Sequence, residues 1–491
     1  MNRPNVVFVI SDQHRWDFMG YASIGVTLTA NLDRLAGEGV AFRNAYCTSP
    51  LCCPSRAAIA SGRYAVHSGC FTNLHELPPG TPTFAAQFRK AGYRTAAFGK
   101  THMEIHAYDS DLTSRAHRDY MDSLGWDEVC EVSGSGMMKT GIVCAYSEFL
   151  KSRGMFEEVL AFYKAWRYFM DPESGRMGEF ESQEWPFDEE LHETRFIADR
   201  AVEWLERHAA EGPFLLHVGF AAPHSPIEPL PRLMDLYRDR PEPTPWGLRE
   251  EGVSPPDDVK GSDPFFADGR RGYRAMISEI DEQVGRIRAA LDELGVLENT
   301  VIVYTADHGD MAGDRGITGK VCFFEGSVHV PLIFAGPGVA PGRKSPALVE
   351  LVDLGKTLCE LCSVPSHDLD EGLSLVPALS GGEPGEGHRD FVVSVMGCDR
   401  MIFDGRYKLM WGDPLLDTRK LGRLHLDKPI NIPPSPPRLY DLEHDPHELN
   451  DLASDEASRE IIEPLLAKLD TRTLEHVTAQ PNKSRGTYRP L

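Results

Sequence analysis

Short apolar runs rich in β-branched residues alternate with amphipathic stretches along most of the chain. The apolar runs cover residues 5–10, 95–98, 214–220, 300–304 and 330–335, and they are typical of strands buried on both faces. Helical patterns cover residues 31–36, 84–91 and 190–209, and a longer one carries Ile277, Ile280, Val284, Ile287, Leu291 and Leu294 before Gly295. This alternation predicts an α/β domain with a large, mostly parallel sheet sandwiched by helices.

A second pattern begins after the turn-rich residues 379–385. Residues 391–396, 401–403 and 407–411 predict short antiparallel strands, and residues 456–473 predict a closing helix. We therefore divide the chain into a catalytic α/β domain (1–380), a small C-terminal α+β domain (381–478) and a polar tail (479–491) that is a candidate arm onto a neighbouring subunit. Residues 104–190 show no clear pattern and are interpreted as an insertion over the site, where substrate selectivity would reside.

Chemically able residues follow four of the predicted buried strands. Asp12 and Gln13 follow the first strand, Lys100 and His102 the second, His224 the third, and Asp307 with His308 the fourth. Ligands of open α/β sheets bind at the carboxyl ends of the strands, so these residues are expected to converge. Asp12, Gln13, Asp307 and His308 offer mainly oxygen donors, which suit Ca²⁺, Mg²⁺ or Mn²⁺, and the imidazole favours the transition metal.

The segment that contains Cys52, Cys53, Pro54, Ser55 and Arg56 is the strongest local motif. Pro54 is expected at the first position of a short helix that closes at Gly62, which places Cys52 at the helix N-terminus. Free N–H groups there favour an anion, and the Arg56 guanidinium one turn later suits a tetrahedral oxyanion. The motif therefore joins a nucleophile precursor to an anion site.

The composition of the chain limits the classes of molecule that the protein is expected to bind. The 491 residues have ordinary hydrophobic (41%) and charged (25%) fractions, but the formal net charge of −23 argues against nucleic acid and anionic membranes. No signal peptide or membrane-spanning run is recognised, so the ten cysteines are expected to be reduced in a cytoplasmic protein. Cys359 and Cys362 are interpreted as helix packing rather than as a redox or zinc pair.

The motif from Cys52 to Arg63 resembles the maturation motif of the type I sulfatases, within the alkaline phosphatase-like superfamily. The resemblance extends to Lys100-x-His102, Pro223-His224-x-Pro226, Asp307-His308-Gly309, Lys320 and residues 439–446. Many sulfatases have consecutive aspartates in place of Asp12-Gln13 and Asp-Asn in place of Asp307-His308. Both departures resemble the branch of phosphonate monoester hydrolases and choline sulfatases, which leaves Ca²⁺ versus Mn²⁺, and sulfate versus phosphorus esters, open.

The resemblance also implies a mechanism. A maturation enzyme would oxidise Cys52 to formylglycine, whose hydrate attacks sulfur or phosphorus while it is held on the metal. Arg56, Lys100 and Lys320 would neutralise the substrate oxygens, and His224 would protonate the leaving group. His102 would help to deprotonate the second hydroxyl, and Asn73 is a further candidate contact with the substrate.

Three hypotheses follow from these observations. The first is a cytoplasmic, formylglycine-dependent hydrolase of small sulfate esters that forms a homo-oligomer. The second is a phosphonate monoester or phosphodiester hydrolase that uses the same residues. The third is a non-catalytic, metal-stabilised binding protein of the same fold.

Overall fold

The computed structural model describes residues 3–22, 26–106, 110–165, 180–247, 263–382, 388–396, 399–411 and 437–474. The tail at 479–491, interpreted above as a subunit arm, lies outside these residues.

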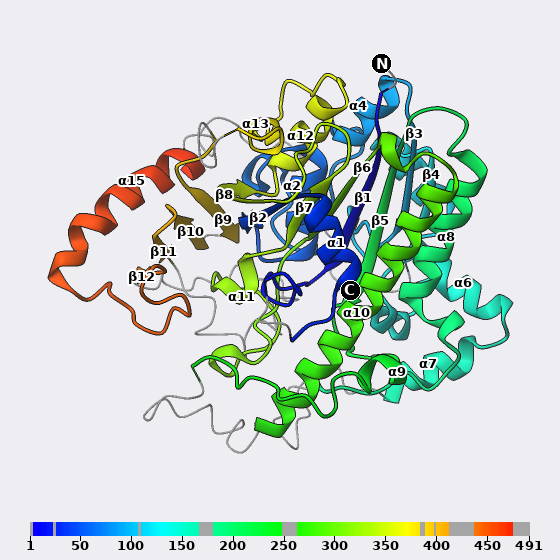
Figure 1. Cartoon of the computed structure of the whole chain (residues 1–491), viewed down its shortest axis with the longest axis horizontal. Helices are drawn as coiled ribbons and strands as arrows, with labels where there is room; N and C mark the ends of the chain where they lie inside the picture. Colours follow the sequence, from blue (N-terminus) through cyan, green and yellow to red (C-terminus); the bar gives the residue numbers. More distant parts are fainter. Residues whose placement is uncertain are drawn as a thin grey trace, which may run out of the picture.

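An eight-stranded sheet forms the centre of the molecule (Figure 1). Its spatial order is β4-β3-β5-β1-β6-β7-β2-β8. Every neighbouring pair is parallel except those made by β7, which runs antiparallel to both β6 and β2. The strands are β1 (Asn5–Asp12), β2 (Gly39–Tyr46), β3 (Arg94–Gly99), β4 (Glu128–Glu131), β5 (Phe214–Pro223), β6 (Thr300–Ala306), β7 (Leu332–Ala335) and β8 (Arg343–Glu350).

Helices cover both faces of this sheet. One face carries α1 (Ala30–Glu38), α8 (Glu193–His208) and α10 (Asp263–Glu293), and the other carries α2 (Cys52–Ser61), α4 (Phe84–Lys90) and α12 (Asp353–Leu361). The remaining helices are α3 (Ala65–Ser68), α5 (Arg115–Ser123), α6 (Ala145–Ser152), α7 (Phe156–Ala165), α9 (Pro231–Met234), α11 (Glu325–Val328) and α13 (Val376–Leu379). Short 3₁₀ turns lie at Ser135–Thr140, Glu189–Leu191, Leu297–Asn299, Asp314–Gly316 and Glu456–Ser458.

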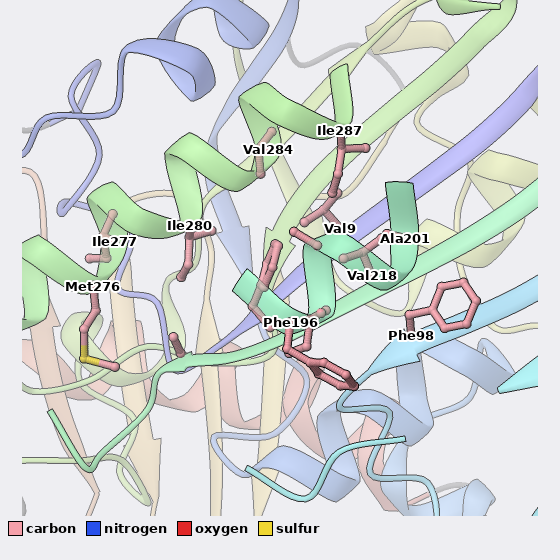
Figure 2. Packing of buried hydrophobic residues seen from close by; sticks show 14 of the residues in the cluster. Val9, Phe98, Phe196, Ala201, Val218, Met276, Ile277, Ile280, Val284 and Ile287 are labelled. Atoms are coloured by element: carbon pink, nitrogen blue, oxygen red, sulfur yellow. The ribbon is translucent and has the colours of Figure 1, made fainter. Parts of the chain in front are cut away.

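Side-chain alternation along β1 explains why the sheet needs both helical layers. Val7 and Val9 join the core beneath α8 and α10, whereas Val6, Phe8 and Ile10 join the core beneath α2, α4 and α12. Figure 2 shows the first of these cores, in which Ile280, Val284 and Ile287 of α10 face Val9 and Val218. The continuous apolar run in β1 is therefore the sequence signature of a strand buried on both faces.

The C-terminal region forms a second, four-stranded antiparallel sheet in the order β12-β11-β10-β9. Its strands are β9 (Val392–Met396), β10 (Asp399–Phe403), β11 (Tyr407–Trp411) and β12 (Arg438–Asp441), and α15 (Arg459–Leu474) packs on one face. The opposite face contributes Met401, Phe403 and Met410 to the main core. The small sheet therefore shares one of its two hydrophobic faces with the large one, as both lie side by side in Figure 1.

The structure confirms the predicted fold class and corrects several details. Four strands, β2, β4, β8 and β12, were not predicted. β8 contains Pro346, which a strand at the sheet edge tolerates where the pairing register shifts. β4 lies inside residues 104–190 yet pairs with β3, so part of this segment completes the main sheet.

The cysteines of the described chain are free thiols, and burial raises the pKa values of Cys359 and Cys362 to about 12. Cys359 lies in α12, as packing in a helix predicts. Within the described residues, we find no helix with the length and apolar character needed to cross a bilayer.

A buried ion pair ties α8 and α10 together. His192 Nδ1 at the N-cap of α8 lies 2.8 Å from Glu279 Oε1 of α10, close enough for charge pairing although not aligned as a hydrogen bond. Burial acts to lower the pKa of His192, but Glu279 and Glu228 outweigh it and raise that pKa to about 9. His192 is therefore a cation inside the folded protein at neutral pH.

This pair predicts a pH dependence of stability. The pKa of His192 is higher in the folded chain than the value of about 6.5 expected when unfolded, so its contribution is complete below pH ~6.5 and is lost as pH rises through ~9. The difference corresponds to roughly 3 kcal/mol. Urea denaturation of the wild type and of Glu279→Gln between pH 6 and pH 10 checks it. Equal pH slopes in the two proteins would contradict the assignment.

Candidate active site

The candidate residues meet where the central strands end. Asp12 is the last residue of β1, Lys100 and His102 follow β3, His224 follows β5, and Asp307 with His308 follow β6. Because β1, β3, β5 and β6 run parallel, these ends lie at one edge of the sheet. Cys52 reaches the same edge as the first residue of α2, whose C-terminus is closed by Gly62 in the left-handed conformation (φ 61°). Pro54 is therefore the third helical residue rather than the first.

Four side chains form a compact cluster of potential metal ligands. Each of Asp12, Cys52, Asp307 and His308 offers one donor atom, and these atoms lie within 4.8 Å of one another. Cys52 Sγ lies 3.1 Å from His308 Nε2 and 3.7 Å from Asp12 Oδ1. All four side chains are buried. The sequence placed these residues at one site, and the structure brings their donor atoms together.

The orientation of His308 fits metal binding. Its Nδ1 lies 3.0 Å from the carbonyl oxygen of Gly309, which can only accept, so Nδ1 carries the proton. Nε2 therefore faces the cluster, as is typical of a metal-ligating histidine that is oriented by a backbone carbonyl. Asp307 Oδ1 accepts hydrogen bonds from the backbone N–H groups of Gln13 and His308, both at 2.9 Å.

Arg56 points at the acidic residues of the cluster. Its Nε donates to Asp307 Oδ2 at 2.7 Å, Nη1 donates to the carbonyl of Lys100 at 2.5 Å, and Nη2 lies 3.4 Å from Asp12 Oδ2. The guanidinium is thus occupied by two acidic members of the cluster and by the backbone beside Lys100. Arg56 therefore pairs with both carboxylates and links them to the backbone of Lys100.

Two lysines supply the positive charge that the site requires. Lys100 Nζ lies 2.6 Å from Asp12 Oδ2, and Lys320 Nζ donates to Gln13 Oε1. Gln13 Nε2 in turn donates to Asp310, whose other carboxylate oxygen accepts from the N–H groups of Ala312 (2.6 Å) and Gly319 (2.9 Å). Asp310 was missed in the sequence, although it lies only three residues after Asp307. It fixes the amide of Gln13 and the turn that leads to Lys320.

These cations determine the ionisation of the cluster. Burial acts to raise the pKa of Asp12, but the charges of Lys100, Arg56 and Lys320 outweigh it and hold that pKa well below its usual value. Burial and Asp12 act to raise the pKa of Cys52, yet Lys320, Lys100 and His308 lower it overall. The site therefore favours anions at its centre, even though the protein as a whole carries an excess of negative charge.

The two remaining histidines are neutral at physiological pH. Burial and the charge of Lys320 lower the pKa of His224 well below its usual value, and burial, His106 and Lys100 do the same for His102. His224 Nδ1 lies 2.7 Å from the carbonyl oxygen of Ser225 and must donate to it. Its Nε2 is therefore the nitrogen that can exchange a proton with a ligand.

Cys53 and Asn73 form a support beside Cys52. Asn73 Oδ1 accepts a hydrogen bond from the backbone N–H of Cys53 at 3.0 Å, and Cys53 Sγ contacts the carbonyl of His75 at 3.1 Å. Cys53 is thus directed away from the metal-ligand cluster. Asn73 lies next to the nucleophile position, where it orients the start of α2.

A separate cavity of about 740 Å³ lies between β2 and the small sheet, with Trp16, Tyr46, His329 and Phe403 in its walls. Its buried polar groups are paired within the protein, since Glu325 contacts Lys408 at 2.8 Å and His329 at 2.7 Å. None of the cluster residues lines this cavity, and we therefore assign the chemistry to the strand-end site instead.

Comparisons with known proteins agree with this geometry. The sulfatase family model matches residues 4–364. An arylsulfatase of Clostridium perfringens is 28% identical over 96% of this chain and 95% of its own length, and a choline-sulfatase of Rhizobium meliloti is 28% identical over 92% of this chain and 82% of its own. The crystal structure of a phosphonate monoester hydrolase of Agrobacterium radiobacter is similar in fold, with a TM-score of 0.74 at 24% identity and 96% coverage of both chains.

The chain therefore belongs to the sulfatase family, within the alkaline phosphatase-like superfamily. It is a sulfuric ester hydrolase with a cluster of residues suited to a divalent metal. The hypothesis of a non-catalytic binding protein is correspondingly set aside.

Arg56→Lys is expected to weaken both stability and metal binding. A lysine cannot reproduce the fork that joins Asp12, Asp307 and the Lys100 carbonyl, so two buried carboxylates lose partners. We expect a loss of about 3 kcal/mol in the free energy of unfolding and a 10- to 100-fold loss in metal affinity. Denaturation and elemental analysis after dialysis measure these quantities. Arg89→Lys is the control, because Arg89 pairs with the exposed Asp122, and a variant of Arg56 as stable and as metal-rich as this control would refute the role.

Proposed function

We propose that this protein hydrolyses sulfate esters with a formylglycine derived from Cys52 and a single divalent metal ion. The observation that carries the proposal is the position of Cys52 Sγ within the four-residue cluster, flanked by Lys100 and Lys320. A side chain at this point can act as a nucleophile and as a metal ligand at once. The positive charges of Lys100 and Lys320 support an anionic substrate.

Asp12, Gln13, Asp307 and His308 would hold the metal, together with the modified residue 52. The donor set and the orientation of His308 Nε2 fit such an ion. When bound, the metal would supply a Lewis acid that favours the ionised form of a neighbouring hydroxyl. Oxygen donors favour Ca²⁺ or Mg²⁺, and the imidazole favours Mn²⁺.

The lysines would bind and orient the ester. Lys100 is anchored to Asp12, and Lys320 is anchored to Gln13, so both ammonium groups are held in place before a substrate arrives. Fixed cations stabilise charge that develops on the transferred group without reorganising during the reaction. Arg56 would act behind them by keeping Asp12 and Asp307 in position.

His224 would give a proton to the leaving oxygen. Its Nδ1 is engaged by Ser225, which leaves Nε2 as the exchanging atom. The neutral form is favoured in the free protein, and the negative charge of a bound ester would favour protonation. His102, also neutral, would accept a proton from the remaining residue-52 hydroxyl in the second half of the reaction. The C–O bond to the transferred sulfate would then break, so that sulfate leaves and the aldehyde forms again.

Gln13 and His308 favour a second candidate activity on phosphorus esters. At these two positions the chain resembles phosphonate monoester hydrolases and choline sulfatases, and the same cations would neutralise a phosphonate monoester or a phosphodiester. For the remaining properties we propose a small-molecule ester substrate, a formylglycine-generating enzyme as maturation partner, a cytoplasmic location and a homo-oligomer. The free, buried thiols are consistent with a reducing compartment.

Replacement of Cys52 tests the nucleophile. Cys52→Ala is expected to lower kcat on the order of 10³-fold or more on an aryl sulfate, because it removes the one side chain of the described cluster that can be converted to formylglycine. Cys53→Ala, the adjacent thiol directed at His75, should retain most of the activity. Mass spectrometry of the peptide with residue 52, from protein made in a host that matures sulfatases, should show an aldehyde in place of the thiol. An active protein with only a thiol at position 52 would overturn the mechanism.

Substrate preference separates the two candidate activities. Steady-state kinetics on an aryl sulfate, an aryl phosphodiester and an aryl phosphonate monoester, each after reconstitution with Ca²⁺ and with Mn²⁺, give kcat/KM for every pair. The proposal expects the sulfate to exceed the phosphorus esters by at least about tenfold, which corresponds to about 1.4 kcal/mol in the transition state. A kcat/KM that is highest for the phosphonate would favour the second activity.

A further inference from the structure

The turn that carries Lys100 and His102 has an unusual backbone. Gly99 has φ 92°, and a Cβ on it would lie 2.0 Å from the carbonyl oxygen of Gly219 in β5, so only glycine fits. His102 has φ 51°, a left-handed conformation that costs free energy for a residue with a side chain. Such a conformation persists only where the surroundings enforce it.

Glu131, at the end of β4, provides that enforcement. Its side chain is fully buried, and it pairs across the sheet with Gly99. Oε1 accepts from the backbone N–H groups of Thr101 at 2.8 Å and His102 at 3.1 Å, and Oε2 accepts from Thr101 Oγ1 at 2.6 Å. One carboxylate therefore satisfies three consecutive donors of the turn.

Two histidines are the other neighbours of the carboxylate, and the charge of His117 acts to lower the pKa of Glu131. Its ion-pair contact within the described residues is with His106 Nε2 at 3.7 Å, and burial together with Lys100 lowers the pKa of His106 to about 3, so that imidazole is uncharged. His106 instead stacks on His102, with ring centroids 4.5 Å apart. Glu131 fixes the backbone of His102 while His106 supports its ring, and His102 Nδ1 has no hydrogen bond to any described residue.

We infer that Glu131 is a positioning residue for the hydrolysis, which acts by holding the Thr101–His102 backbone so that the His102 imidazole keeps a single orientation in the active site. The inference rests on the proposed role of His102. It gives β4 a function in the active site, although the sequence analysis placed this strand within the insertion at residues 104–190.

The three donors allow a sharp test with the full-length, metal-loaded protein. Glu131→Gln keeps an Oε1 acceptor for both backbone N–H groups, and its Nε2 can donate to Thr101 Oγ1, so kcat on an aryl sulfate should stay within about threefold of wild type. Glu131→Ala loses all three hydrogen bonds and should lower kcat about 10- to 100-fold with KM changed less than about threefold. Thr101→Val removes one hydrogen bond and should lie between them. Glu128→Ala, which changes a residue on the same strand that contacts Trp204, is the matched control.

A double-mutant cycle with His102→Ala separates positioning from general destabilisation. If Glu131 acts through His102, then Glu131→Ala should change kcat less than about threefold in the His102→Ala background. Fully multiplicative losses, or a Glu131→Ala variant with wild-type kcat, would overturn the inference. A His102→Ala variant with wild-type kcat would instead refute the proposed role of His102. If Glu131→Ala does not fold, Glu131→Asp replaces it in the cycle, because it keeps the charge but withdraws the acceptor atoms from the turn.

Discussion

The active site depends on the pairing of two buried carboxylates with neighbouring cations. Asp12 and Asp307 are fully buried, and isolated charges in such a position are strongly disfavoured. Arg56 pairs with both carboxylates and Lys100 pairs with Asp12, with nitrogen–oxygen distances between 2.6 and 3.4 Å. Arg56 also donates to the carbonyl of Lys100, so the helix that begins at Cys52 and the turn after β3 are locked to the same pair of acids. The geometry of the nucleophile and that of the cations are therefore set by one interaction.

This arrangement resolves a contradiction in the composition. A net charge of −23 repels anionic esters at long range, and salt screens that repulsion beyond about 10 Å. Under the proposed function, an anionic ester would meet Lys100 and Lys320 at short range, and these lysines are anchored to Asp12 and Gln13. Local positive charge within a negative molecule also disfavours large polyanions, which would contact the surface as well as the site.

The sequence predicted the central strands and the residues at their ends because strands buried on both faces leave continuous apolar runs. It did not predict β2 and β8, since β2 carries Arg43 and Asn44 at positions where the strand is not fully buried, and β8 tolerates a proline at the sheet edge. The identity of the cluster residues was predictable, but the direction of Arg56 was not. Spacing places a side chain on a helix, whereas the choice between substrate and carboxylate depends on neighbours hundreds of residues away. Asp310 and Glu131 were not predicted, because both accept hydrogen bonds from backbone N–H groups and no sequence pattern marks such partners.

The burial of Cys52 limits when another enzyme can reach this residue. Its side chain lies at the start of α2 with 2% exposure, beneath the ends of the central strands. The small sheet also closes on the adjacent chain, because the backbone N–H of Val395 in β9 donates to the carbonyl of Thr48 at 2.9 Å. While the fold is intact, the active site of another enzyme has no access to the Cys52 side chain. An enzyme that acts on Cys52 would therefore need a chain in which the start of α2 is still accessible.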